Sequence, residues 1–236
     1  MQIKLNKKPK NPVIIEGFPG FGLVGTIASE FLVDHLECEQ IGKIIFDDLP
    51  PLVAIHDNKV VEPLGIFHDK KHNVVILHAV TASNGIEWEL GNTLVKLAKE
   101  LEAKEVISLE GVGSGDKVEE TKTFYYTSEE SRKKVFKNMG IEPLKEGIIM
   151  GVTGALLLRA EGVPLSCIFA ETHSSLPDSK AAAKVIETLD KYLGLNVDTQ
   201  PLLEQAAKFE DKLKGMLSQG HKMQEMSDKK KMSYVG

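Results

Sequence analysis

The sequence predicts an α/β fold, with a mixed, largely parallel sheet flanked by helices. Short apolar runs alternate with stretches of helical periodicity over most of residues 12–195, as in sheets built from strand–helix–strand units. Glycine-rich turns follow several of these runs and allow the chain to turn sharply. From residue 199 onward the apolar residues recur in a heptad pattern instead, which predicts an additional C-terminal helix.

Composition restricts the class of protein. The 236 residues suffice for one large α/β domain, alone or with an appendage, and a hydrophobic content of 42% is normal for a globular core. The net charge of −5 argues against nucleic-acid binding by charge alone. The two cysteines, Cys38 and Cys167, lack metal-ligand spacing. One disulfide is formally possible, but a reducing cytosol is the simpler setting.

Targeting segments are not evident. Residues 1–10 are basic and lack the apolar core of a signal peptide. No apolar run approaches the roughly 18–20 residues needed to cross a membrane. We therefore expect a soluble, cytoplasmic protein.

The chain is organised around residues 13–36. Val13–Glu16 is an apolar run that predicts a buried strand, and residues 26–36 predict an amphipathic helix. Between them, four glycines within residues 17–25 allow a sharp turn. The unpaired N–H groups and partial positive charge of the helix N-terminus point into this turn, so it could hold an anion.

A dinucleotide site is one interpretation of this turn. Residues 20–25 match G-x-G-x-x-G, and Asp47 and Asp48 follow where a ribose-binding acid would lie. We disfavour it because the next strand, at 41–46, is followed by further strand-like runs rather than by a helix. Close packing of the helix on the sheet explains the glycine spacing equally well.

The remaining strands are predicted from short apolar runs. They lie at 3–5, 41–46, 53–56, 60–67, 74–79, 105–110, 122–126, 143–150 and 164–170. The runs 53–56 and 60–67 flank a polar turn as a hairpin, in which Pro63 indicates an edge strand or a bulge. The run 74–79 is apolar on both faces and therefore predicts a central strand.

The remaining helices are predicted from apolar residues at helical spacing, at 86–101, 129–139, 155–160 and 181–192. Ser83 is expected to cap the first of these, and Asp178 the last, which ends at Gly194. Further glycine turns are expected at 111–116 and 151–154.

The C-terminal segment contains about three heptads. Its apolar seam consists of Leu202, Ala206, Phe209, Leu213, Met216, Gly220 and Met223. Such a helix packs on the domain's own surface or pairs with another subunit or partner, and the sequence leaves both open. We expect an α/β domain at 1–196, the helix at 199–226 and a flexible tail at 227–236.

Acid–base candidates lie where predicted parallel strands end. Glu110 and Glu171 each end such a strand, and His173 follows two residues after Glu171. Open α/β sheets bind ligands at this edge, so these side chains could form an acid–base or metal site. The chain has no G-x-S-x-G elbow, no H-E-x-x-H pair and no Walker loop. With only two arginines, it offers little for a multi-phosphate clamp.

Several motifs together resemble one known family. Residues 16–25 are E-G-F-P-G-F-G-L-V-G, and Asp48-Leu49-Pro50-Pro51 follows. Glu110–Gly113, Gly151–Gly154 and Ala170–Thr172 add to the pattern. On these residues the chain is similar to the proteasome assembly chaperone 2 family, in its archaeal branch, over most of residues 12–195. The family motif comprises Gly17, Phe18, Pro19, Gly20, Gly22 and Gly25.

The resemblance implies a fold similar to that of purine nucleoside phosphorylases. It also implies a non-enzymatic, ATP-independent chaperone without a cofactor or metal, which binds proteasome α-subunits and forms homo-oligomers. The heptad positions named above, apart from Gly220, would then form the oligomer or partner helix. Some family members end in a hydrophobic–Tyr–any residue motif that docks between α-subunits. Here the ending is Ser233-Tyr234-Val235-Gly236, with tyrosine third from the end rather than second, and Tyr234, Val235 and Gly236 are the candidate contacts.

The alternative is an enzyme. It would be a nucleoside- or nucleotide-handling hydrolase or transferase that uses the glycine turns with Glu110, Glu171 and His173. The two hypotheses differ in the role of residues 199–236. A chaperone of this kind should need them for partner binding, whereas the enzyme should not need them for activity.

Overall fold

The computed structural model describes residues 1–46, 54–56, 59–79, 85–113, 121–172 and 176–206, together with positions 208 and 215; for 54–56 and 59–61 only the backbone is described. Within these ranges no helix is both long and apolar enough to cross a membrane. The heptad and tail positions Phe209, Leu213, Met216, Met223, Tyr234, Val235 and Gly236 lie outside them, as do Asp47, Asp48, Ser83 and His173.

The elements alternate as the apolar runs predict. The strands are β1 (Gln2–Leu5), β2 (Val13–Gly17), β3 (Glu39–Ile45), β4 (Ala54–His56), β5 (Lys59–Val61), β6 (Leu64–Asp69), β7 (Val74–Ala79), β8 (Glu105–Gly113), β9 (Thr123–Thr127), β10 (Glu142–Pro143) and β11 (Leu165–Thr172). The helices are α1 (Val24–His35), α2 (Glu87–Glu100), α3 (Glu130–Asn138), α4 (Gly151–Arg159), α5 (Ser179–Leu193) and α6 (Gln200–Glu204), and the 3-10 turn η1 (Phe21–Leu23) precedes α1.

Nine strands form one sheet in the order β1-β3-β6-β7-β2-β8-β11-β9-β10, and β4 pairs with β5 in a separate hairpin. Strands β7, β2, β8 and β11 run parallel in the centre. On one side, β1, β3, β6 and β7 pair antiparallel, and on the other side β9 runs antiparallel to β11. The mixed α/β prediction is confirmed, although parallel pairing is confined to the centre and to the short β9–β10 pair.

The topology excludes the dinucleotide fold. After β2 and α1 the chain enters β3, which pairs antiparallel with β1 and β6 instead of lying parallel beside β2. The neighbours of β2 are β7 and β8. The first strand–helix–strand unit that such a fold needs is therefore not formed.

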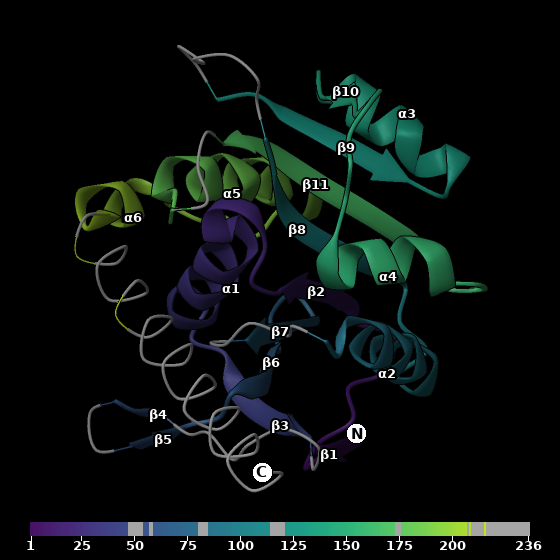
Figure 1. The fold of residues 1–236 in the computed structure, drawn as a ribbon, viewed down its shortest axis with the longest axis vertical. Helices are drawn as coiled ribbons and strands as arrows, with labels where there is room; N and C mark the ends of the chain where they lie inside the picture. Colours follow the sequence, from purple (N-terminus) through teal and green to yellow (C-terminus); the bar gives the residue numbers. More distant parts are fainter. Residues whose placement is uncertain are drawn as a thin grey trace, which may run out of the picture.

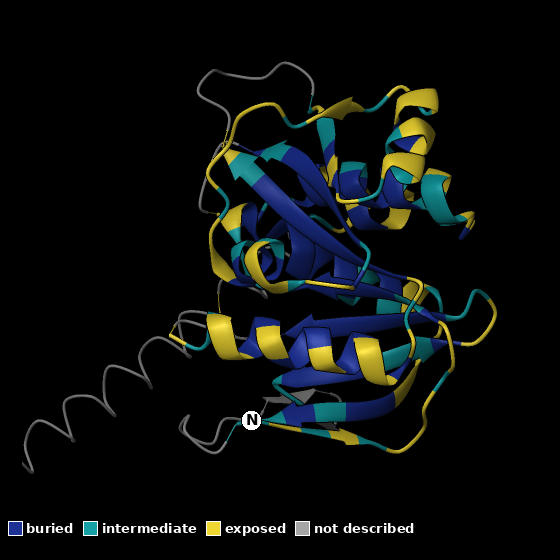
Figure 2. Cartoon of the chain, turned by 90° about the vertical axis from the view of Figure 1, so that its right-hand side faces the viewer, coloured by how far each residue is buried: buried dark blue, intermediate teal, exposed yellow. Residues whose placement is uncertain are grey.

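Helices cover both faces of the sheet (Figure 1), which is therefore buried between two layers (Figure 2). Alternate residues of the central strands enter different cores, as the period of two along a strand requires. Ile15 packs in the core under α1 and α5, whereas Ile14 packs in the core under α2 and α4. At one end Phe136 of α3 stacks between Tyr125 and Tyr192, with ring centroids 4.7 and 4.6 Å apart.

Pro63 breaks a predicted strand. The run expected at 60–67 is divided between β5, which belongs to the hairpin, and β6, which belongs to the main sheet. Proline lacks the N–H that a ladder needs, so the chain changes sheets at this point. The edge-or-bulge interpretation of Pro63 is therefore wrong.

Two predicted glycine turns are also wrong in part. Gly111–Gly113 continue strand β8, where Gly111 and Gly113 pair with residues of β11. Gly151–Gly154 form the first turn of α4, with Gly151 at φ +70°. A Cβ atom at Gly111 or Gly154 would lie 2.1 or 2.9 Å from a backbone oxygen, so these two glycines reflect close backbone approach rather than a loop. Of the strand expected at 143–150, only Pro143 lies in a strand, the two-residue β10.

The ends of α5 agree with the sequence, whereas the start of α2 does not. The side chain of Asp178 accepts a hydrogen bond from the Ala181 N–H at 3.0 Å and caps α5, which ends at Gly194 in the left-handed conformation. The expectation that Ser83 caps α2 is wrong, because the N-cap position of this helix is Ile86, without a side-chain hydrogen bond. Leu90, Leu94 and their helical neighbours Leu97 and Leu101 are buried, as their spacing predicts.

Candidate functional site

The glycine turn before α1 lies directly on strand β8. A Cβ atom at Gly20 would lie 1.9 Å from Glu110 Oε1, and one at Gly25 would lie 2.3 Å from the carbonyl oxygen of Leu109. Neither approach is possible for a larger residue without displacing β8 or its side chain. The packing interpretation of the glycine spacing is therefore confirmed.

Carboxyl groups of the chain itself accept hydrogen bonds from N–H groups of this turn. Glu110 Oε1 accepts hydrogen bonds from Phe21 N at 3.1 Å and from Gly111 N at 3.2 Å. Glu16 Oε2 accepts one from Phe18 N at 3.2 Å. Two acidic side chains thus already accept hydrogen bonds from the N–H groups that an anion would need at this turn.

The two carboxyl groups are joined through two hydroxyl groups. Ser108 Oγ donates to Glu16 Oε1 at 2.5 Å, and Thr153 Oγ1 lies 2.8 Å from Ser108 Oγ and 3.0 Å from Glu110 Oε2. The path Glu110–Thr153–Ser108–Glu16 therefore has three links, but its two hydroxyl groups supply only two hydrogens. The Thr153 hydroxyl also lies 3.2 Å from Glu16 Oε1, so one proton held by the pair of carboxyl groups supplies the hydrogen that this network lacks.

Burial also favours the protonated form. Glu16 is 1% exposed, and burial raises its pKa from 4.5 to about 7. Glu110 is 8% exposed, and burial followed by the charge of Glu16 raises its pKa to about 8. Within the described residues, no hydrogen bond or ion pair joins a basic side chain to either carboxyl group. The pair is a packed structural network to which a substrate has little access.

The proposed partners of Glu110 are not part of this network. Glu171 lines a surface groove, and its Oε2 accepts a hydrogen bond from Lys122 N at 3.4 Å. His173 lies outside the described residues. Sequence reasoning missed Glu16, although a signal exists. Strand β2 ends in Glu16-Gly17, the adjacent parallel strand β8 carries Glu110-Gly111 near its carboxyl end, and both pairs follow apolar runs. The described residues contain no group of three or more His, Cys, Asp or Glu side chains placed to hold a metal ion.

A serine–histidine pair also lies in the interior. Ser29 Oγ is 2.8 Å from His78 Nδ1, which resembles the nucleophile and base of a hydrolase. Ser29 is 0% exposed, however, and its hydroxyl also has the carbonyl oxygens of Gly17 and Thr26 as acceptors at 3.2 and 3.1 Å. The pair ties α1 to β2 and β7, and no substrate can reach the hydroxyl.

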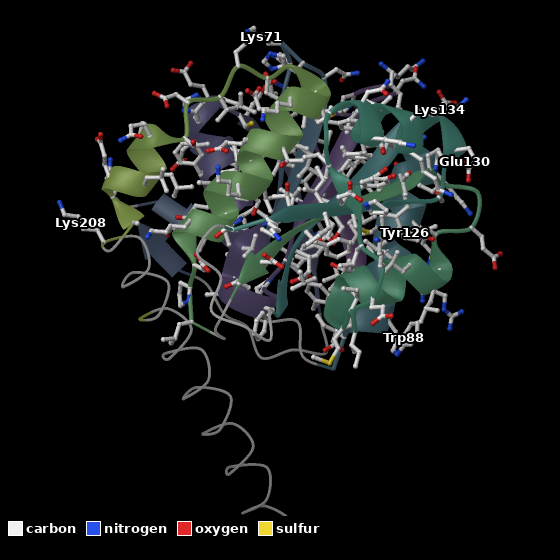
Figure 3. The ribbon with its side chains drawn as sticks, turned by 90° about the horizontal axis from the view of Figure 1, so that it is seen from above. Lys71, Trp88, Tyr126, Glu130, Lys134 and Lys208 are labelled. Atoms are coloured by element: carbon white, nitrogen blue, oxygen red, sulfur yellow. The ribbon has the colours of Figure 1, made fainter. Side chains whose placement is uncertain are left out.

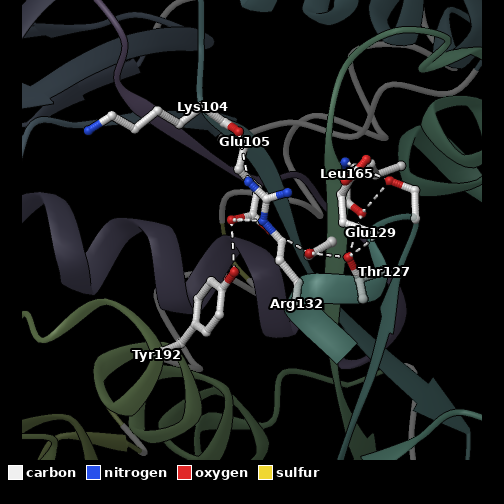
Figure 4. Close-up of polar contacts among 9 residues, drawn as sticks. Lys104, Glu105, Thr127, Glu129, Arg132, Leu165 and Tyr192 are labelled. Atoms are coloured by element: carbon white, nitrogen blue, oxygen red, sulfur yellow. Dashed lines mark hydrogen bonds and ion pairs between the residues drawn. The ribbon is translucent and has the colours of Figure 1, made fainter. Parts of the chain in front are cut away.

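Another buried carboxylate lies at the opposite end of β8 (Figure 4). Glu105 Oε2 is 2.9 Å from Arg132 Nε and accepts from the Tyr192 hydroxyl at 3.0 Å, while Ser166 donates to Oε1. Burial raises the pKa of Glu105, and these partners oppose that effect. Because Arg132 also donates to the Lys104 carbonyl oxygen at 2.9 Å, the cluster fastens α3 and α5 to the sheet.

Exposed apolar side chains lie on α4, on the segment that enters it and at the start of the neighbouring helix α2. We call Trp88, Ile148, Met150 and Leu158 the apolar face. Their exposed fractions are 52%, 91%, 77% and 69%, respectively. Residues 147–158 contain no charged side chain. Arg159 lies 5.1 Å from the ring centroid of Trp88, which Figure 3 shows on the outer surface of the molecule. Uncharged surfaces rich in large apolar side chains are typical of protein-binding sites.

The motif and heptad residues differ in their surroundings. Phe18 is buried at 3%, and Pro19 is half-buried, so the family motif serves the packing of the turn. Leu202 is 3% exposed and belongs to the core under α1 and α5. Ala206 is half-buried. The first seam position is therefore filled by this chain's own body.

Comparisons with known proteins agree with this architecture. A family model described as the PAC2 family matches residues 14–217. The uncharacterized protein MJ0106 of Methanocaldococcus jannaschii is 29% identical over 228 residues, which cover 96% of this chain and 94% of that protein.

Solved structures show the same fold. The crystal structure of Pyrococcus furiosus PbaA, described as an archaeal homolog of proteasome-assembly chaperone, matches with a TM-score of 0.85 and 32% identity over 94% of this chain and 100% of that chain. Pyrococcus furiosus PbaB, described as an archaeal proteasome activator, matches with a TM-score of 0.74 and 23% identity over 91% and 97%. At that identity the PbaB match shows the fold alone.

Proposed function

Because the chain belongs to the PAC2 family, we propose that it is an ATP-independent proteasome assembly chaperone that binds proteasome α-subunits and acts as a homo-oligomer. The similarity to PbaA, itself described as a homolog of a proteasome-assembly chaperone, supports a role in assembly. The partner, the oligomer and the absence of catalysis are our inferences.

The apolar face is the observation that carries the proposal. Ile148, Met150 and Leu158 are mostly exposed, and the twelve residues 147–158 that contain them carry no charge. A folded chain gains nothing by leaving such side chains in water, whereas burial of each in an interface contributes about 1.5–3 kcal/mol. A protein that transiently covers apolar surfaces of unassembled subunits needs a surface of this kind.

The glycine turn supports independence from ATP. Its N–H groups at Phe18 and Phe21 already bond the carboxyl groups of Glu16 and Glu110. A phosphate would have to displace both carboxyl groups from a buried network. Among the contacts of the described residues, no Arg or Lys side chain bonds to this network to offer a phosphate a positive charge. The same burial withholds these carboxyl groups from a substrate, which favours a binding protein over the nucleoside-handling enzyme.

The test is capture of proteasome α-subunits from the same source organism, followed by native mass spectrometry of the complexes. Met150→Asp places a charge in the apolar face, and we expect capture to fall about 30-fold, the effect of losing roughly 2 kcal/mol at an interface hot spot. Val135→Asp is the matched control, because Val135 is 43% exposed on α3 and lies outside the apolar face. Its capture should equal that of the wild type.

A shortened chain separates the body from the tail. Ending the chain at Ala206 retains the buried Leu202 and the start of the predicted heptad helix, and it removes the rest of that helix and the tail. Capture by the full-length protein alone would place the contact in residues 207–236, and capture by both would place it on the α/β body. If neither protein captures α-subunits, the chaperone proposal is wrong, and nucleosides and nucleotides should be screened for binding.

A further inference from the structure

A groove of about 600 Å³ opens beside the apolar face. It lies between the ends of β8 and β11, the start of β9 and the segment 142–148. Its apolar lining includes Val112, Phe124 and Leu144. Ile148 belongs both to this lining and to the apolar face, so the two surfaces are continuous.

The groove is acidic. Glu142, Glu146 and Glu171 line it, and Lys145 is the one basic residue among its described lining residues. A ligand for this groove should therefore be cationic and carry large apolar groups.

One segment of this chain has that chemistry. Residues 229–235 are K-K-K-M-S-Y-V, three lysines followed by methionine, tyrosine and valine. We propose that this segment docks in the groove of its own molecule, with its lysines on Glu142, Glu146 and Glu171 and its apolar side chains in the lining. This inference is independent of the identity of the partner in the proposed function.

The connection is long enough. The described C-terminal helix α6 ends at Glu204, and about 25 residues lead from there to Lys229. They span up to roughly 85 Å when extended, and about 40 Å when residues 205–226 form the predicted helix. A globular chain of this size has a radius of gyration of only about 17 Å. A tethered segment also competes at an effective concentration in the millimolar range, so weak docking suffices to fill the groove.

Docking has a consequence for the apolar face. Because Ile148 is common to both surfaces, the docked segment would cover part of the face that we propose for partner binding. The tail and the partner would then exclude one another. The chain could in this way limit exposure of its apolar face until a partner displaces the tail.

Zero-length carbodiimide cross-linking of the full-length protein tests this contact, because the reagent joins an amine to a carboxylate only when the two touch. Mass spectrometry of the digested monomer should find Lys229–Lys231 joined to Glu142, Glu146 or Glu171. The double variant Glu142→Gln/Glu146→Gln should reduce the yield at the remaining Glu171 roughly fivefold, about the effect of two exposed ion pairs. The matched control Glu129→Gln/Glu130→Gln, at the start of α3, should leave the yield unchanged.

A charge swap separates docking from incidental reactivity. Lysine-to-glutamate changes at 229–231 should abolish the cross-links. Combining these changes with Glu142→Lys/Glu146→Lys should restore cross-links, now between carboxylates at 229–231 and amines at 142 and 146. Failure of the swap to restore them would overturn the proposal, as would cross-links spread equally over Glu129 and Glu130. In a mixture of isotope-labelled and unlabelled protein, each cross-linked pair should consist of two labelled or two unlabelled peptides. Pairs that join a labelled to an unlabelled peptide would refute docking within one molecule. None of these results depends on whether α-subunits bind.

Discussion

The buried carboxyl pair makes stability depend on pH in an unusual direction. In the folded protein Glu110 has a pKa of about 8, against 4.5 for an ordinary glutamate. Between these pH values the folded state holds the proton and the unfolded state releases it, so stability falls as pH rises. The contribution is complete below about pH 4.5 and lost above about pH 8. The gap of about 3.5 pH units at 1.4 kcal/mol each corresponds to roughly 5 kcal/mol.

Glu110→Gln removes this dependence while preserving the shape of the side chain. The amide oxygen can accept from Phe21 N and Gly111 N, and the amide N–H can donate to Thr153 Oγ1, as the protonated acid does. At pH 5 the variant and the wild type should therefore differ little in stability. At pH 9 the variant should be more stable by roughly 3–5 kcal/mol, because it avoids a second buried charge beside Glu16.

The assay is denaturant unfolding of both proteins at five pH values from 5 to 9, followed by circular dichroism. The quantity to compare is the variant's free energy of unfolding minus that of the wild type. Titrating groups distant from the pair cancel in this difference, whereas Glu16, whose charge acts on Glu110, contributes to it. It should rise steadily with pH and level off above about pH 8, at constant m-value. A difference that is flat over the whole range would refute the inferred protonation of Glu110, and so would one that falls.

Three further predictions concern stability and are measured by the same unfolding assay. Gly20→Ala should cost about 2–3 kcal/mol, because the new methyl group collides with the Glu110 carboxyl group. Leu202→Ala should cost about 2–4 kcal/mol, because the side chain is 3% exposed in the main core. Arg132→Met should cost about 3 kcal/mol, because it leaves Glu105 buried without its cation.

Each of these predictions has a control in the chain. Gly113→Ala should be nearly neutral, since a Cβ there would meet the Phe21 ring at an ordinary 3.5 Å. Leu203→Ala should cost well under half as much as Leu202→Ala, since Leu203 is 38% exposed. The Arg132 prediction is wrong if the additional change Glu105→Gln fails to recover stability, because the cost is assigned to the unpaired charge.

Local pattern was sufficient to predict most elements. The strands at 13–16, 74–79 and 164–170 follow from apolar runs that fill both cores, and Asp178 and Gly194 mark the ends of α5. Strands and helix ends of this kind can be predicted because they depend on residues that are neighbours in the sequence. The sequence indicated a disturbance at Pro63, since proline removes a ladder hydrogen bond, but it did not predict that the chain would change sheets there.

The carboxyl network was beyond local pattern. The network requires that β2 lie beside β8, although Glu16 and Ser108 are 92 positions apart in the sequence. It also requires that α4 bring Thr153 within hydrogen-bond distance of Ser108 and Glu110. Strand order is set by the packing of the whole chain, so one strand-end acid alone could not identify its partner. The same limit explains why Glu171, equally placed in sequence, lines the groove instead.

The two ends of the main sheet bear on how copies of the protein can associate. The outer strand β10 is only two residues long, Glu142 and Pro143, and the other outer strand β1 carries Lys4 in the middle of its ladder. Short edges, proline and lysine are the features that prevent sheets from joining end to end into open-ended polymers. A protein with exposed apolar side chains such as Ile148 and Met150 is thereby protected from runaway fibre growth. Crowding in the cell should favour closed, side-chain-mediated assemblies over continuous β-structure.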